Sequence, residues 1–258
     1  MDAGLLRRAL EPLRLNAGGI PPHGGVEEPP LLADDVDIWS FPLDVEPARL
    51  EALRTGLSAD ENERAERFVF PRHRDRFRAG RGQLREILAR YLRVAPSAVA
   101  FEYGPQGKPR LAGEAAVRFN LSHSEHKAVV AVARDREVGI DLERVRPTVE
   151  CEPLAQRFFS PAETAALLAL PSSVRARAFY AYWTCKEAFL KAKGGGLNIP
   201  LDEFEVSVDA GSARIVRTAW DPRDAGRWSL SVLPAPPGFA AALVVEGKHP
   251  RLRPREAE

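Results

Sequence analysis

Asp141, Glu143, Glu187 and Lys191 are the residues whose types and spacing most clearly indicate chemistry. Asp141 and Glu143 follow a short apolar run, and Glu187 and Lys191 lie four residues apart in a longer segment. Mg²⁺ in proteins is bound by a few carboxylate oxygens together with water and substrate phosphate. A lysine ammonium can reach the same phosphate. Three carboxylates and one lysine therefore predict a metal-assisted phosphoryl-group enzyme.

Two elements must position these side chains. Residues 138–142 are apolar and β-prone around a glycine, which predicts a short buried strand. Residues two apart on a strand point to one face, so Asp141 and Glu143 project together. The segment that holds Glu187 and Lys191 predicts a long helix, in which residues four apart share a face. If the strand and the helix meet, the three carboxylates converge.

Each pair also has an ordinary structural interpretation. An Asp-x-Glu at a strand end is usually a solvated edge, and a Glu–Lys pair four apart on a helix is usually a weak surface ion pair. A third block, Phe119-Asn120-Leu121-Ser122-His123-Ser124, with Gly107-Lys108-Pro109 upstream, favours the functional interpretation.

With these blocks, the chain resembles the 4′-phosphopantetheinyl transferases, specifically the larger two-lobed Sfp-type family. The resemblance runs from about Val36 to Val245, and the blocks occur in the family's order. The matching segments are residues 107–109, 119–124, 138–143, 158–160 and 183–191.

The resemblance implies an α+β fold with two pseudo-symmetric lobes, each an antiparallel sheet packed with helices, and an active site in the cleft between the lobes. The predicted organisation is a flexible N-terminal extension over residues 1–35, lobes over 36–134 and 135–250, and a tail over 251–258. Because one chain holds both lobes, we expect a monomer.

The resemblance also implies the reaction. The enzyme transfers 4′-phosphopantetheine from coenzyme A to a serine of an apo acyl or peptidyl carrier protein. Asp141, Glu143 and Glu187 are expected to hold Mg²⁺, with Mn²⁺ as an alternative. Lys191 neutralises charge on the phosphate, and Glu187 accepts the serine proton. The expected catalytic residues are Glu187, Lys191 and Asp141.

Further residues are expected to bind coenzyme A. A dianionic phosphate favours several donors from different elements. In the family, a basic residue at the position of Arg64 meets the 3′-phosphate, and Lys108, Ser122 and His123 match the rest of that site. The full predicted set is Arg64, Arg81, Lys108, Asn120, Ser122, His123 and Lys191.

Composition limits the alternatives. The 258 residues carry 37 basic and 36 acidic side chains, so no strong field would attract nucleic acid or a membrane. The two cysteines, Cys151 and Cys185, do not predict a disulfide framework, and a cytoplasmic location fits. The absence of a long apolar run predicts neither a signal peptide nor a membrane span.

Two other classes of function were weighed. Acidic clusters with a lysine also serve metal-dependent nucleases, but the near-neutral charge balance and the Gly-Lys-Pro and Ser-His-Ser contexts disfavour that class. A non-catalytic carrier-binding module is disfavoured because the three carboxylates and Lys191 are all present. Glu163 is a candidate fourth acid, although Ser160-Pro161-Ala162-Glu163 favours a helix-capping role for it.

Overall fold

The computed structural model describes residues 31–104, 107–194, 199–209 and 211–256, so most of the predicted N-terminal extension lies outside the described residues. The strands are β1 (Asp35–Pro42), β2 (Phe101–Tyr103), β3 (Pro109–Leu111), β4 (Val117–Ser124), β5 (Lys127–Arg134), β6 (Val138–Arg144), β7 (Phe204–Ser207), β8 (Arg214–Thr218), β9 (Trp228–Leu233), β10 (Phe239–Glu246) and β11 (Arg251–Glu256). The α-helices are α2 (Pro47–Thr55), α3 (Ala59–Glu66), α4 (Pro71–Leu92), α5 (Cys151–Phe158), α6 (Pro161–Leu168) and α7 (Ser172–Lys193). Short 3-10 helices are η1 (Pro96–Ala98), η3 (Leu201–Glu203) and η4 (Asp224–Arg227).

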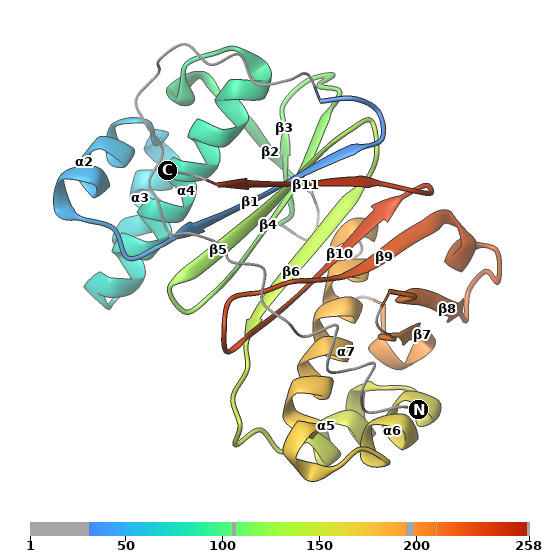
Figure 1. Ribbon diagram of the computed structural model, residues 1–258. Helices are drawn as coiled ribbons and strands as arrows, with labels where there is room; N and C mark the ends of the chain where they lie inside the picture. The colour runs from blue at the N-terminus through green and yellow to red at the C-terminus, as the bar shows by residue number, and fades with distance from the viewer. Residues whose placement is uncertain (1–30, 105–106, 195–198, 210, 257–258) are drawn as a thin grey trace.

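Two sheets form the centre of the molecule, with helices outside them. In the described part of the chain, one sheet has the order β11-β1-β5-β4 and the other the order β6-β10-β9. Figure 1 shows α2 to α4 beside the first sheet and α5 to α7 beside the second. Separate apolar cores lie under α4, under α7 and between the two sheets. Helices thus enclose two facing sheets, which is an α+β arrangement.

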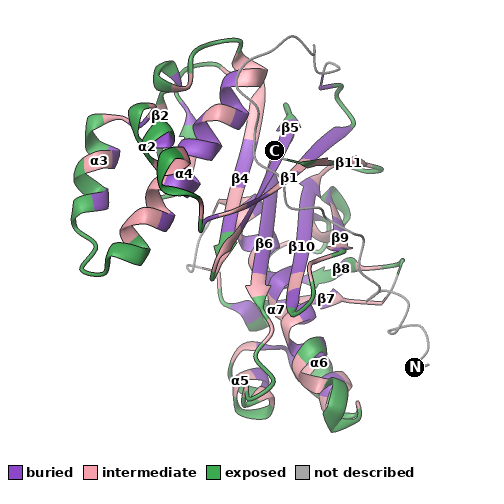
Figure 2. Ribbon diagram, turned by 60° about the vertical axis from the view of Figure 1, so that its left-hand side comes forward, coloured by how far each residue is buried: buried purple, intermediate pink, exposed green. Residues whose placement is uncertain are grey.

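Strand β5 contributes side chains to two of these cores. Its side chains alternate, with Val130 and Val132 in the core under α4 and Val129 and Ala131 in the core between the sheets. Because successive side chains on a strand point to opposite faces, a strand buried on both faces is apolar throughout. Figure 2 shows long buried stretches along β5 and along β6 and β10 of the other sheet.

Gly139 allows α7 to lie directly against β6. A Cβ atom at this position would lie 2.1 Å from the carbonyl oxygen of Ala188 and 2.3 Å from the amide nitrogen of Ala192. No side chain fits at such distances, so a glycine is required for this close approach. The strand carrying Asp141 and Glu143 is thereby pressed against the helix carrying Glu187 and Lys191.

Side chains of β4 join the first sheet to β6. Asn120 Oδ1 accepts the amide of Ile140 at 2.9 Å, and Ser122 Oγ accepts the amide of Leu142 at 3.2 Å. Ser124 Oγ continues the series by accepting the amide of Arg144 at 3.0 Å. Polar side chains two apart on one strand thus satisfy alternate amides of another, as a neighbouring strand would. These three bonds, called the β4–β6 seam below, place β4 at the candidate site.

The chain ends depart from the predicted organisation. Residues 251–256, predicted as part of a tail, form β11 and pair in parallel with β1. The buried carboxylates of Asp35 and Asp37 explain this, because Arg251 lies 2.5 Å from Asp35 and Arg253 lies 2.5 Å from Asp37. Asp35, assigned to the flexible extension, is itself buried in β1.

The α+β class and the antiparallel sheets are confirmed, whereas the pseudo-symmetry and the lobe boundaries stay predictions. Helix α4 begins at Pro71, since proline is tolerated in the first turn of a helix. None of the helices in the described part of the chain has both the length and the apolar character needed to cross a bilayer.

Candidate active site

Asp141, Lys191 and Ser122 form the centre of the site, where β4, β6 and α7 meet. The Lys191 ammonium donates to Asp141 Oδ1 at 2.6 Å and to Ser122 Oγ at 2.9 Å. The Ser122 hydroxyl in turn donates to Asp141 Oδ1 at 2.9 Å. The strand and helix therefore bring the predicted carboxylate and lysine into direct contact, and the side chain of Ser122 completes the group.

The second oxygen of Asp141 has no partner. Asp141 Oδ2 is buried and accepts no hydrogen bond among the described residues. A buried carboxylate oxygen without a partner is costly, because its desolvation is not compensated. A cation or a proton donor is therefore the natural ligand at this atom.

Glu143 and Glu187 lie close enough to Asp141 to feel its charge. Burial raises the pKa of Glu187, and the charges of Asp141 and Glu143 raise it further, against the effect of Lys191. Burial and the charge of Asp141 also raise the pKa of Glu143, against a hydrogen bond from Ser124. Carboxylates that repel one another and lack a compensating cation favour binding of a positive ion.

A divalent cation fits these residues as an open site. Among the described residues, no three His, Cys, Asp or Glu side chains form a group that could hold a metal ion by themselves. Mg²⁺ commonly takes one or two carboxylates and completes its coordination with water and substrate phosphate. The unpartnered oxygen of Asp141, with Glu143 and Glu187 beside it, is suited to such an ion.

His123 lies at the edge of the same group. Partial burial lowers the pKa of its imidazole, and the positive charges of Lys191 and Arg76 add to this effect, against Asp141. No hydrogen bond of this imidazole is present among the described residues. Arg76 is buried and donates to Asp44 at 2.6 and 2.8 Å. His123 is therefore an available donor beside positive charge.

Lys108 reaches the site from the other side, through the backbone of α7. Its ammonium donates to the carbonyl oxygen of Lys191 at 2.7 Å and lies 3.4 Å from both Val138 O and a carboxylate oxygen of Glu137. The sequence predicted a phosphate ligand here, whereas the acceptors around the ammonium are protein oxygens. The predicted role in binding coenzyme A stays a prediction.

Arg64 and Arg81 have no contact with this central group. Arg64, in the last turn of α3, is exposed and lines a surface hollow with Arg67 and Phe68. Arg81 is buried in α4, where its guanidinium pairs with Glu61 at 2.5 Å. Arg64 is thus free to meet a ligand, whereas Arg81 is already engaged.

Three site features escaped the sequence analysis. Asn120 was expected to bind coenzyme A, but its amide oxygen is occupied by the backbone of β6. Ser124, which holds Glu143 at 3.0 Å, was not singled out. Gly139 was noted only as a glycine in a strand. Polar Asn120, Ser122 and Ser124 at every second position of β4 were the signal that could have predicted these side-chain bonds to the backbone of β6.

Glu163 belongs to the scaffold rather than to the site. Its carboxylate accepts the amide of Ser160 at 2.8 Å in a capping box, which confirms the capping interpretation. It also pairs with the fully buried ammonium of Lys186 at 2.8 Å and accepts the amide of Val206 at 2.8 Å. These bonds fix α6 against α7 and β7.

Comparisons with known proteins show which family the chain belongs to. A family model described as "4′-phosphopantetheinyl transferase superfamily" matches residues 137–244, and one described as "4′-phosphopantetheinyl transferase, N-terminal" matches residues 45–135. The 4′-phosphopantetheinyl transferase HetI of Nostoc sp. is 44% identical over 231 residues, covering 87% of this chain and 94% of the relative. The 4′-phosphopantetheinyl transferase Sfp of Bacillus subtilis is 33% identical over 162 residues, covering 58% and 71%.

A solved structure, that of Thermotoga maritima holo-[acyl-carrier-protein] synthase, is 29% identical and covers 43% of this chain and 63% of its own, with a TM-score of 0.35. That score is too low to relate the two folds in detail. The two family models together span both halves of the molecule, and HetI is matched over nearly its whole length. The chain therefore belongs to the 4′-phosphopantetheinyl transferase superfamily.

Proposed function

We propose that this enzyme transfers the 4′-phosphopantetheine group of coenzyme A to a serine of an apo carrier protein and releases adenosine 3′,5′-bisphosphate. The observation that carries the proposal is the contact of Asp141 with Lys191, which leaves one buried oxygen of Asp141 open beside two further carboxylates. Family membership supports the same activity.

Asp141, Glu143 and Glu187 are the residues that would hold Mg²⁺, or Mn²⁺ in its place. Bound there, the ion would neutralise charge on the pyrophosphate of coenzyme A. The ammonium of Lys191 lies at the same place, 2.6 Å from Asp141. We propose that it turns toward the phosphate when the donor binds and balances the charge on the leaving group.

Glu187 is the proposed acceptor of the serine proton, directly or through one water. Its carboxylate is half-buried and has no hydrogen bond or ion pair among the described residues. Burial and the charges of Asp141 and Glu143 raise its pKa in the metal-free protein, whereas a bound cation would lower it, so the position of Glu187 rather than its basicity supports this role. In this proposal Glu187 both binds the metal, with Asp141 and Glu143, and accepts the proton.

We propose that Arg64 and His123 recognise the 3′-phosphate of coenzyme A. Both side chains are exposed, and neither has a hydrogen bond or ion pair among the described residues. A phosphate would give both a charged partner. The other predicted ligands have protein partners: Ser122 bonds Asp141 and Lys191, Asn120 bonds the backbone of β6, and Arg81 pairs with Glu61.

The carrier protein is the proposed second substrate, and a monomer with one complete site in the cytoplasm is the proposed state. All the carboxylates and the lysine come from one chain, which supports the monomer. Two free cysteines, one of them buried, are consistent with a reducing compartment. Light scattering that detects a stable dimer, together with loss of activity on dilution, would contradict the monomer.

The deciding experiment is incubation with coenzyme A, Mg²⁺ and an apo carrier protein, followed by mass spectrometry of the carrier. The carrier should gain the mass of one phosphopantetheine. Asp141→Ala should lower the rate by about 100-fold or more, which corresponds to roughly 3 kcal/mol of lost transition-state stabilisation. Cleavage of a nucleic acid substrate without carrier modification would favour a nuclease, and carrier binding without modification would favour a non-catalytic module.

A further inference from the structure

The C-terminal turn of α7 carries Lys191 and is held by unusual contacts. The last carbonyl groups of a helix have no partner within the helix and must find one elsewhere. The carbonyl oxygen of Lys191 accepts the amide of Gly194 at 3.3 Å and the ammonium of Lys108 at 2.7 Å. Both the backbone and the side chain of this residue are therefore held, the side chain by Asp141 and Ser122.

Lys108 connects two parts of the chain that are distant in sequence. It directly precedes β3, beside the first sheet, whereas its acceptors lie at the start of β6 and the end of α7. An ammonium has three hydrogens to donate, and three acceptors lie within 3.4 Å of it, on Lys191, Val138 and Glu137. A positive charge at a helix C-terminus is also favoured by the helix dipole.

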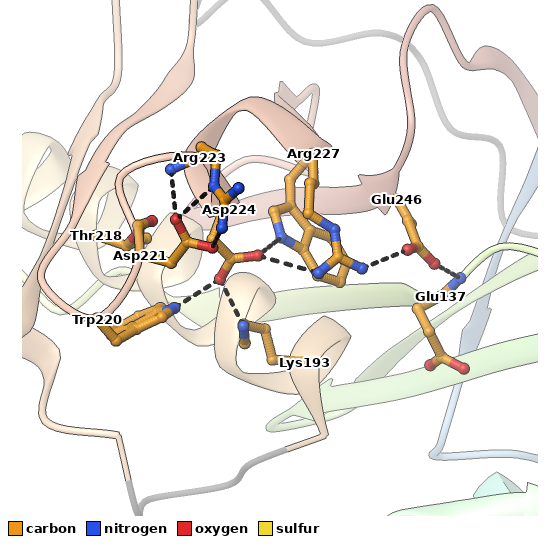
Figure 3. A network of polar contacts seen from close by, with 10 residues as sticks. Glu137, Lys193, Thr218, Trp220, Asp221, Arg223, Asp224, Arg227 and Glu246 are labelled. Atoms are coloured by element: carbon orange, nitrogen blue, oxygen red, sulfur yellow. Dashed lines mark hydrogen bonds and ion pairs between the residues drawn. The ribbon is translucent and has the colours of Figure 1, made fainter.

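The same turn is held from its other side by Asp224. Figure 3 shows the carboxylate of Asp224 between the ammonium of Lys193 and the indole nitrogen of Trp220. The indole of Trp228 also donates to this carboxylate. The distances are 2.5 Å to Lys193, 2.7 Å to Trp220 and 3.1 Å to Trp228. Asp224 is buried, so this contact is protected from solvent.

The two contacts belong to one network. Arg227 lies 3.7 Å from Asp224 and 3.0 Å from Glu246, and Glu246 accepts the amide of Glu137 at 3.5 Å (Figure 3). The carboxylate of Glu137 lies 3.4 Å from Lys108. The polar groups thus form a continuous clamp around the last turn of α7, with Lys108 at one end and Asp224 at the other.

We propose that Lys108 is a positioning residue, which holds the last turn of α7 and so places the ammonium of Lys191 for the reaction. This inference rests on the proposed function. Lys108 acts on the backbone of residue 191, and a shift of that turn would move the Lys191 ammonium away from the phosphate. A misplacement of about 1 Å can lower a rate by about 100-fold. In this role Lys108 does not contact the 3′-phosphate.

The test compares Lys108→Met, which keeps the length of the stem and removes the ammonium, with the wild type. Both are assayed with coenzyme A and with 3′-dephospho-coenzyme A. A positioning role lowers kcat by about tenfold or more with both donors and changes KM little. In a Lys191→Ala background, the same substitution should cost less than about twofold, because the group it positions is gone. Lys108→Arg, which can still donate to the carbonyl, should recover most of the rate.

Two comparisons complete the design. Lys248→Met makes the same chemical change at an exposed lysine and should leave both kinetic constants unchanged. Arg64→Ala should weaken use of coenzyme A much more than use of the dephospho donor. If Lys108→Met behaves like Arg64→Ala, raising KM for coenzyme A alone, or if it keeps its full effect without Lys191, the positioning role is wrong.

A measurement without substrate separates this inference from the proposed function. Hydrogen exchange of the Gly194 amide, which bonds the last turn of α7, should be faster in Lys108→Met than in the wild type. Unchanged exchange overturns the clamp, whatever the activity. An inactive wild type with a faster-exchanging variant would instead overturn the proposed function and leave the clamp in place.

Discussion

Asp141 makes opposite uses of its two carboxylate oxygens. Oδ1 accepts the Lys191 ammonium and the Ser122 hydroxyl, whereas Oδ2 is buried without a partner among the described residues. Glu143 and Glu187 lie near it, and burial together with the charge of Asp141 raises the pKa of both carboxyl groups. The excess negative charge of the three carboxylates therefore favours the binding of a cation at this site.

Replacing Glu187 should show that its charge lowers the stability of the metal-free protein but is needed for activity. Glu187→Gln removes one repelling charge, so we expect a higher melting temperature in the absence of divalent ions, with transfer activity reduced by about 100-fold or more. The pH dependence follows from the raised pKa. A carboxyl group whose pKa is raised on folding stabilises the protein below its unfolded value and loses that contribution as pH rises through the folded value.

The stability difference between Glu187→Gln and the wild type should therefore be small near pH 4.5, the ordinary value, and grow as pH rises above it. Thermal melts at a series of pH values measure this difference. Glu203→Gln, at an exposed glutamate, is the control and should show no such trend. A Glu187→Gln variant that is less stable than the wild type at neutral pH would contradict the repulsion between the carboxylates.

The contact of β6 with α7 decides whether these residues meet at all. Asp141 and Glu143 are on the strand, Glu187 and Lys191 are on the helix, and Gly139 sets the distance between the two elements. The β4–β6 seam adds Ser122 to the same place. Because three elements are needed, a small displacement of one of them disperses the site.

Gly139→Ala should therefore impair both stability and activity. Its methyl group would overlap the backbone of α7 at Ala188 and Ala192, and inserting a methyl into a packed contact costs about 1–3 kcal/mol or more. Urea unfolding measures the stability, and the carrier assay measures the rate. Gly226→Ala, where a Cβ atom has open space, is the matched control. Equal stability of the two variants would show that α7 can move away from β6 without cost.

The first and last described strands lie side by side in one sheet. Strand β11 lies in parallel beside β1, and Arg251, Arg253 and Arg255 face the fully buried carboxylates of Asp35 and Asp37. Alternate residues of a strand share a face, so the three arginines all meet the two aspartates. The last residues of the chain therefore support the first sheet, on which β4 and its contribution to the site depend.

Loss of this strand should destabilise the whole protein. A buried charge that loses its partners and is left uncompensated costs about 3–5 kcal/mol. Arg253→Met should show a smaller loss in urea unfolding, because Arg251 and Arg255 still face the two aspartates. A chain ending at Pro250, which lacks all three arginines, should show a loss of at least this order. Arg217→Met, which breaks the exposed pair with Glu205, should cost only about 0–1 kcal/mol. A truncated protein as stable as the full chain would show that β11 contributes nothing.

Short-range features of this protein were determined by its sequence alone. The spacing of Asp141 with Glu143 and of Glu187 with Lys191, the capping box at Ser160, and the α+β class were all predicted correctly. Each depends on geometry that repeats every two residues in a strand or about every four in a helix, so neighbours in sequence suffice to predict it.

Long-range contacts were decided only by the tertiary structure. Three contacts join residues far apart in sequence. They are the pairing of β11 with β1, the bond of Asn120 to the backbone of β6, and the bond from Lys108 to the carbonyl oxygen of Lys191. Such contacts depend on which buried polar groups need partners once the layers have packed, because an unsatisfied buried group is costly. No local periodicity records that requirement, so the sequence did not predict the contact between Lys108 and the end of α7.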